Sequence, residues 1–121
     1  MTETRKPIAL VVEDDQNLAN AFGYSLEAFD VKIINHGGKA LEWLKEGNLP
    51  KVVVLDLNLP GARGTDILDY LRAEERFKSV RVIVTTANDR VAERLHSRAD
   101  LVLLKPVGYR QLQELANRLN H

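Results

Sequence analysis

The chain has 121 residues, 45% hydrophobic and 28% charged, with 17 basic residues, 17 acidic residues and no cysteine. This composition predicts one folded domain rather than a disordered chain, and a formal charge of zero argues against a dedicated nucleic-acid binder. The missing cysteines exclude disulfides, thiol catalysis and cysteine-based zinc sites. Met1 to Pro7 is polar and charged, unlike a signal peptide, and no apolar run approaches the ~20 residues that span a bilayer. We therefore expect a cytoplasmic protein that does not contact a membrane.

Short apolar runs rich in β-branched residues recur along the chain and predict five strands. They are Ile8–Val12, Val31–Ile34, Val52–Leu55, Val82–Val84 and Leu101–Leu104. Most of these runs are continuously apolar, as strands are when helices cover both faces of their sheet.

Segments with the apolar spacing of helices follow each strand. They run from Leu18 to Phe29, Ala40 to Leu44, Ile67 to Leu71, Val91 to Ala99 and Leu112 to Leu119. Asp15 and Asp89 are placed to cap the first and fourth of these helices.

The regular alternation of strand and helix predicts parallel strands joined by helical crossovers. We expect an α/β fold, a doubly wound five-stranded parallel sheet of order 2-1-3-4-5 with helices on both faces, as in flavodoxin. Residues 1–121 are expected to form a single domain, with no output domain in this sequence.

Polar residues follow four of the apolar runs. They are Glu13, Asp14 and Asp15 after the first run, Asp56 after the third, Thr85 and Thr86 after the fourth, and Lys105 after the fifth. In a sheet of this kind, ligands bind at the carboxyl ends of the strands, so these side chains are expected to converge.

Such a pocket has the components for phosphoryl transfer onto a carboxylate. Clustered carboxylates raise each other's pKa, and an oxygen-only ligand set that resolves the conflict favours Mg²⁺. Lys105 and Thr86 supply a charge and a hydroxyl for a phosphoryl group, and Asp56 is a nucleophile. Taken singly, each residue is more often a helix cap, a turn residue or a solvated charge, but their joint placement favours the functional interpretation.

These residues resemble the receiver domain of two-component response regulators, over essentially the whole chain. Val11–Asp15 resembles the acidic motif that ends the first strand, and Leu55–Gly61 resembles the segment around the phosphorylated aspartate, with Gly64 opening the third helix. Val84–Ala87 resembles the hydroxyl motif of the fourth strand, and Lys105–Pro106 resembles the signature after the fifth.

The resemblance implies a metal site and a phosphoryl acceptor. Asp56 would accept the phosphoryl group and, with Asp14, bind Mg²⁺ directly. Glu13 would act on the metal through water, and Asn58 would offer its backbone carbonyl.

The resemblance also implies a switch and its partners. Lys105 would pair with Asp56 and then with a phosphoryl oxygen, Thr86 would move to bind the phosphoryl group, and the Lys105–Pro106 peptide would be cis. The donor would be a sensor histidine kinase or a histidine phosphotransfer protein. A downstream protein, or a second copy in a phosphorylation-dependent homodimer, would bind the face of the fourth helix, fifth strand and fifth helix. Catalysis would be confined to the domain's own phosphoryl transfer and autodephosphorylation.

Several positions depart from the family pattern or carry further features. Val102 stands where the family usually has an aromatic switch residue, so the output is expected to depend on movement of the fourth helix instead. Arg98 stands where a glycine is common, which requires an unstrained backbone there. Arg90, Arg94 and Arg98 would share one face of the fourth helix. His36, His96 and His121 show no metal-ligand spacing and are interpreted as incidental.

Other functions on a similar framework remain open. A phosphohydrolase of the haloacid dehalogenase type would need an aspartate two residues after Asp56, where this chain has Asn58. A flavin or nucleotide carrier would need a Gly-rich or Ser/Thr-rich loop where Glu13, Asp14 and Asp15 stand. A receiver that is never phosphorylated is disfavoured by the intact acids and Lys105.

Overall fold

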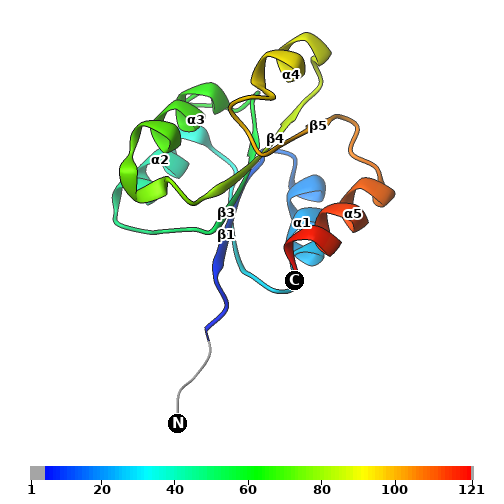
Figure 1. Cartoon of the computed structure of the whole chain (residues 1–121), viewed down its shortest axis with the longest axis horizontal. Helices are drawn as coiled ribbons and strands as arrows, with labels where there is room; N and C mark the ends of the chain where they lie inside the picture. The colour runs from blue at the N-terminus through cyan, green and yellow to red at the C-terminus, as the bar shows by residue number, and fades with distance from the viewer. Residues whose placement is uncertain (1–4, 121) are drawn as a thin grey trace.

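The computed structural model describes residues 5–120 and has alternating strands and helices (Figure 1). The elements are β1 (Ile8–Val12), α1 (Gln16–Ser25), β2 (Asp30–Ile34), α2 (Gly37–Lys45), β3 (Val52–Asp56), α3 (Gly64–Ala73), the 3-10 turn η1 (Glu75–Phe77), β4 (Arg81–Thr86), α4 (Asp89–Leu95), β5 (Leu101–Leu104) and α5 (Tyr109–Leu119). The predicted order of elements is confirmed.

The strands form one parallel sheet in the order β2-β1-β3-β4-β5, which confirms the predicted fold class. The central strand β3 is buried at every position, whereas the edge strand β2 alternates between exposed and less exposed residues. The difference follows from position, because only the central strands have both faces covered and neighbours on both sides.

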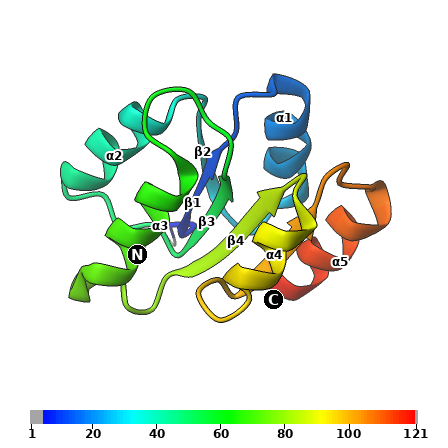
Figure 2. The same cartoon turned by 90° about the horizontal axis from the view of Figure 1, so that it is seen from above.

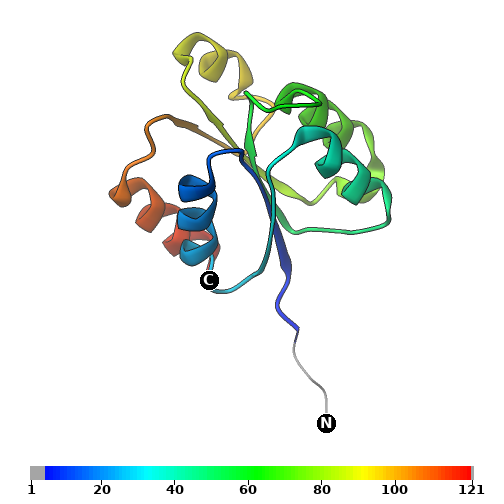
Figure 3. The same ribbon diagram turned by 180° about the vertical axis from the view of Figure 1, so that it is seen from behind.

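Two apolar clusters lie on opposite faces of the sheet. Helices α2, α3 and α4 cover one face through residues such as Leu44, Leu68 and Leu95, and α1 and α5 cover the other through residues such as Phe22 and Leu115. Figure 2, seen from above, shows the sheet between these helix layers, and Figure 3 shows α1 and α5 together on the same side. Both faces are therefore closed, and polar side chains reach the surface at the ends of the strands.

The strand limits differ from the prediction at the functional edge. Strand β3 extends to Asp56 and β4 extends to Thr86, so the residues expected to follow these strands are their last members. Both strands continue because their polar ends still pair across the sheet, with Asp56 opposite Thr85. A prediction based on apolar runs stops too early at such positions.

The helix caps are partly as predicted. The Asp15 carboxylate accepts a hydrogen bond from the Leu18 backbone N–H and caps α1, as expected. The prediction for α4 is wrong by one residue, because Asn88 accepts hydrogen bonds from the Arg90 and Val91 backbone N–H groups and Asp89 is already helical.

The fourth helix is shorter than its apolar spacing predicts. Helix α4 ends at Leu95, so Arg98 lies in the turn before β5 rather than on a helical face with Arg90 and Arg94. The Arg98 side chain pairs with Asp69 of α3 instead. The expectation of an unstrained backbone at Arg98 is confirmed, since every residue of 5–120 with positive φ is a glycine.

Within residues 5–120, no helix has the length and apolar character needed to cross a membrane.

Candidate functional site

The carboxyl edge of the sheet gathers the predicted site residues on the side of α1 and α5. Glu13, Asp56 and Lys105 each lie two residues after a member of the apolar cluster on that side, and strand side chains alternate with a period of two. Glu13 follows β1, Asp56 ends β3 and Lys105 follows β5. The geometric prediction that the strand ends share one pocket is confirmed for these residues.

Three carboxylates form the acidic part of this pocket. Oxygen atoms of Glu13, Asp14 and Asp56 lie within 4.8 Å of one another. Glu13 and Asp56 are only 1% and 2% exposed, whereas Asp14 is exposed to solvent. The cluster thus combines buried acids with one open side from which a ligand can approach. We call Glu13, Asp14, Asp56 and Lys105 the acidic pocket.

Lys105 supplies the positive charge of the acidic pocket. Its Nζ lies 3.0 Å from Glu13 Oε1 and 3.1 Å from Asp56 Oδ2. Burial alone would lower the pKa of Lys105, but the interactions of its ammonium with the accepting carboxylates of Glu13 and Asp56 outweigh burial and raise this pKa above its ordinary value. The pocket therefore holds one ammonium among three carboxylates, which leaves excess negative charge at one edge of the sheet.

Glu13 is the acid most affected by burial. Desolvation raises its pKa to about 7, against the opposing effects of a hydrogen bond from the Asp15 backbone N–H and of Lys105. Its Oε1 atom has no hydrogen bond of good geometry among the described residues, although Lys105 faces it. A buried carboxylate oxygen in this state fits an additional cationic ligand, and the all-oxygen donor set suits Mg²⁺.

The loop after β3 is held tightly against Asp56. The Asn58 backbone N–H donates to Asp56 Oδ1 at 3.1 Å, and this fixes the orientation of the carboxylate. Gly64, which opens α3, packs so closely that a Cβ there would lie 2.4 Å from the Asp56 carbonyl oxygen. Only a glycine permits this approach, so the resemblance of Gly64 to the family pattern has a steric reason.

The same loop is also held by α2. The Gly37 backbone N–H donates to the Pro60 carbonyl at 2.8 Å, and the His36 ring lies where a side chain on Gly61 would be. His36 Nδ1 accepts a hydrogen bond from the Lys39 backbone N–H and caps α2. His36 therefore has a structural role that its spacing in the sequence does not reveal, as a helix cap and as a ring packed against the loop that contains Gly61. His121 lies outside the described residues.

Thr86 lies near the acidic pocket but does not face the acids. Residues two positions before it, such as Val84, belong to the cluster under α2, α3 and α4, so Thr86 is on the other face of the sheet from Asp56. Its hydroxyl accepts a hydrogen bond from the Asn88 backbone N–H at 3.1 Å. The expected cis peptide bond between Lys105 and Pro106 is confirmed.

A family model for the response regulator receiver domain matches residues 9–117. The chain belongs to this family. It is 36% identical over 112 residues to the DNA-binding response regulator MtrA of Mycolicibacterium smegmatis, which is 91% of this chain and 49% of MtrA. It is 38% identical over 109 residues to the sensory transduction protein RegX3 of the same species, covering 85% of this chain and 46% of RegX3.

The chain spans about half the length of these curated relatives. Among solved structures, a CheY-like response regulator receiver domain from Methylobacillus flagellatus has a TM-score of 0.76 and 26% identity over 93% of this chain and 98% of that one. This receiver domain therefore has a signalling role in two-component systems, and the fold, the acidic cluster and the sequence matches agree.

Thr85, the neighbour of Thr86, is among the polar residues expected at the strand ends, but the sequence assigns it no role. Its hydroxyl is fully buried, and it pairs with Asp56 across the sheet. The sequence carries a signal for it, because a second threonine interrupts an apolar run one residue before the strand ends. Threonine is common in strands, however, and only the register shows that this one lies beside Asp56.

Proposed function

We propose that this receiver is a phosphorylation-dependent switch that accepts a phosphoryl group on Asp56 in a Mg²⁺-dependent reaction. The observation that carries the proposal is the acidic pocket itself, where the buried Asp56 carboxylate lies beside two further acids and the Lys105 ammonium. A pocket that only stabilised the fold would gain little from such excess negative charge, because buried like charges are costly.

The proposed reaction is an in-line displacement at phosphorus. An Asp56 carboxylate oxygen forms a P–O bond while the bond from phosphorus to the donor's histidine nitrogen breaks, and the electron pair leaves with that nitrogen. Asp14, Asp56 and the backbone carbonyl of Asn58 would hold Mg²⁺ directly and Glu13 would act through water. A bound Mg²⁺ supplies charge neutralisation for the phosphoryl oxygens. Lys105 would contribute a second positive charge, and the Asn58 N–H keeps the carboxylate oriented.

The surface beside the pocket supports a protein as phosphodonor. A hollow next to Lys105 is lined by the apolar side chains of Leu18, Pro106 and Val107, together with Asp15 and Asn17. An apolar rim around a charged site suits the docking of a helical protein that presents a phosphohistidine, either a histidine kinase or a histidine phosphotransfer protein.

The proposed output is movement of α4 and its neighbours. Val102 is half-buried and packs against the cluster under α2, α3 and α4. A valine has no aromatic ring, so this position cannot act as an aromatic switch. Thr86 would turn toward the phosphoryl group, break its hydrogen bond with Asn88 and release the start of α4. The α4–β5–α5 face would then bind a downstream protein or a second copy of the chain. The formal charge of zero favours proteins over nucleic acid as direct partners.

The proposal is tested by phosphorylation with a small donor. The protein is incubated with acetyl phosphate and Mg²⁺, and its intact mass is measured over time. We expect the wild type and the control variant Asp89→Asn, which changes an exposed aspartate of α4, to gain one phosphoryl group. Asp56→Asn should gain none, and chelation of Mg²⁺ should prevent the gain in all proteins.

Other results would contradict the proposal in distinct ways. Labelling of Asp56→Asn would place the phosphoryl group on another residue, and no labelling of the wild type by any donor would indicate a receiver that is never phosphorylated. Multiple turnover of a phosphomonoester would instead support a phosphohydrolase.

A further inference from the structure

The Thr85 hydroxyl is buried in β4, and strand pairing alone does not explain why a hydroxyl stands at this position. Its side chain is 0% exposed, and its Oγ1 atom has no hydrogen-bond partner within residues 5–120. A buried hydroxyl without a partner destabilises a fold relative to a methyl group of the same shape, so it needs a specific reason. Valine has that shape and occupies several neighbouring positions of the sheet.

The register of the sheet places Thr85 between the acids and the root of Lys105. Thr85 pairs with Asp56 of β3 on one side and with Leu103 of β5 on the other. Ile83, two residues earlier, belongs to the cluster under α1 and α5, so Thr85 faces the same side of the sheet as Asp56. The other buried oxygen without a hydrogen bond among the described residues, Glu13 Oε1, belongs to the same pocket.

The Lys105 side chain must pass over Thr85 to reach the acids. Lys105 follows β5, and its Nζ contacts Glu13 after β1 and Asp56 of β3. Strand β4 lies between β5 and β3, and neighbouring strands are about 4.8 Å apart. The stem of Lys105 therefore crosses β4 at the level of its last residues, on the face to which Thr85 belongs.

We propose that Thr85 is a positioning residue whose hydroxyl accepts a hydrogen bond from the Lys105 ammonium when a divalent cation binds Asp56 in the acidic pocket. This inference rests on the proposed function, because it names a further residue of the same pocket. The ammonium and a directly bound cation compete for the Asp56 carboxylate, and an ammonium displaced without another acceptor would lose a partner while its side chain is only 24% exposed. Thr85 provides that acceptor along the path of the stem.

The hydroxyl is better suited to Lys105 than to Asp56. Both Asp56 oxygens are already engaged, Oδ1 by the Asn58 backbone N–H and Oδ2 by Lys105. The Lys105 ammonium has three N–H donors and faces two carboxylates, so one donor is left for a further acceptor.

The test is calorimetric titration of the unphosphorylated protein with MgCl₂ at constant ionic strength. Thr85→Val removes the hydroxyl and keeps the shape, and we expect the Mg²⁺ dissociation constant to rise about three- to tenfold, which corresponds to the net contribution of one hydrogen bond from the partly exposed Lys105 ammonium. Thr85→Ser keeps the hydroxyl and should bind Mg²⁺ as the wild type does. An unchanged dissociation constant in Thr85→Val would overturn the proposal.

A second background separates positioning from a general packing effect. In Lys105→Met no ammonium competes with the cation, so adding Thr85→Val should leave Mg²⁺ binding unchanged. The same loss in this background would show that the effect does not involve Lys105 and would also overturn the proposal. Should Thr85→Val fail to fold in a thermal melt, Thr85→Ala compared with Thr85→Ser measures the same hydroxyl.

The two proposals fail in different ways. If the wild type gains no phosphoryl group on Asp56 but the valine variant binds Mg²⁺ more weakly, the proposed function fails and the role of Thr85 stands. If Asp56 is phosphorylated and the valine variant binds Mg²⁺ normally, only the inference about Thr85 fails.

Discussion

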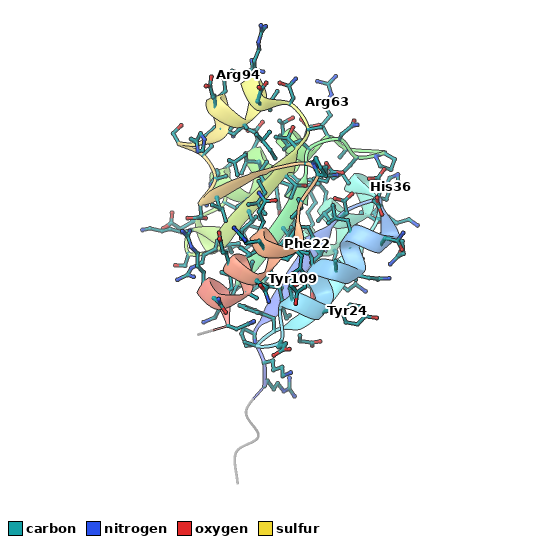
Figure 4. All side chains as sticks on the ribbon, turned by 90° about the vertical axis from the view of Figure 1, so that its right-hand side faces the viewer. Phe22, Tyr24, His36, Arg63, Arg94 and Tyr109 are labelled. Atoms are coloured by element: carbon teal, nitrogen blue, oxygen red, sulfur yellow. The ribbon has the colours of Figure 1, made fainter. Side chains whose placement is uncertain are left out.

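The acidic pocket and the α4 region, residues 89–100, lie near the same edge of the sheet but are stabilised by different interactions. In the pocket, Glu13 and Asp56 are buried on or beside central strands, and Lys105 contacts both. The α4 region has one short helix with Ala92 and Leu95 as its buried residues. Its Arg94 projects from α4 at the outer edge of the molecule (Figure 4).

The ion pairs that join the α4 region to α3 lie at the surface, while Leu95 and Ala99 reach into the core. Arg98 pairs with Asp69 of α3, and Arg72 of α3 pairs with Asp100, with partly exposed side chains in both pairs. Exposed ion pairs contribute little to stability, so we expect these pairs to oppose a movement of α4 only weakly. The contrast separates the buried acidic pocket, to which we assign the proposed chemistry, from a region joined to α3 by exposed ion pairs, to which we assign the proposed output.

The largest effect on stability should come from removing the cation of the pocket. Lys105→Met leaves the buried Glu13 and Asp56 carboxylates without their common partner, and we expect a loss of about 3 kcal/mol in the free energy of unfolding at pH 8. Urea unfolding measures this loss, and Mg²⁺ should recover part of it. A change below about 0.5 kcal/mol would mean that the ion pairs of the acidic pocket stabilise the fold no more than exposed ion pairs do.

A second large effect is expected where the loop approaches Asp56. Gly64→Ala would place a Cβ 2.4 Å from the Asp56 carbonyl oxygen and force the backbone apart, with an expected loss of about 2 kcal/mol. Gly23→Ala in α1 is the matched control, because its Cβ would meet only ordinary contacts at 3.6 Å. The control should be stabilising by up to about 1 kcal/mol, since alanine favours helices over glycine. Equal effects in the two variants would contradict the close packing of the loop.

The pH dependence of stability should show the raised pKa of Glu13. Its pKa is about 7 in the folded protein, whereas an unperturbed glutamate, as in the unfolded chain, has a pKa of 4.5. Folding therefore favours the protonated form of Glu13. The corresponding stabilisation is fully present below the ordinary pKa and is lost as the pH rises through the folded value. Relative to the wild type, Glu13→Gln should therefore gain about 1–2 kcal/mol between about pH 6 and pH 8, measured by urea unfolding without divalent cations. A constant difference across that range would contradict the shift.

The smallest effect is expected in the α4 region. Arg98→Ala removes the pair with Asp69, and because the side chains of Arg98 and Asp69 are 39% and 60% exposed, we expect a loss of about 0.5 kcal/mol. Arg94→Ala is the control without such a pair, and it should change stability by less than about 0.5 kcal/mol. Amide hydrogen exchange should nevertheless be faster in α4 of Arg98→Ala. A loss as large as that of Lys105→Met would remove the contrast between the two regions.

The sequence by itself determined the order of strands and helices and the identity of the acids at the strand ends. Both follow from local patterns, since apolar periodicity and chain topology decide which face is buried and where strands end. For β1 and β5 the predicted limits agree with the structure, because apolar residues fill these strands completely. The convergence of Asp56 and Lys105 was predictable for the same reason.

Only the tertiary structure decided the features that depend on partners far apart in the chain. The pairing of Asp56 with Thr85 extends β3 and β4 beyond their apolar runs. The side chain of Arg98 is positioned by its ion pair with Asp69 and not by a helical repeat. The packing of the His36 ring against Gly61 likewise joins residues that are distant in the sequence. The buried hydroxyl of Thr85 has meaning only beside Lys105, because whether a polar atom is satisfied depends on what the fold brings within a few ångströms of it.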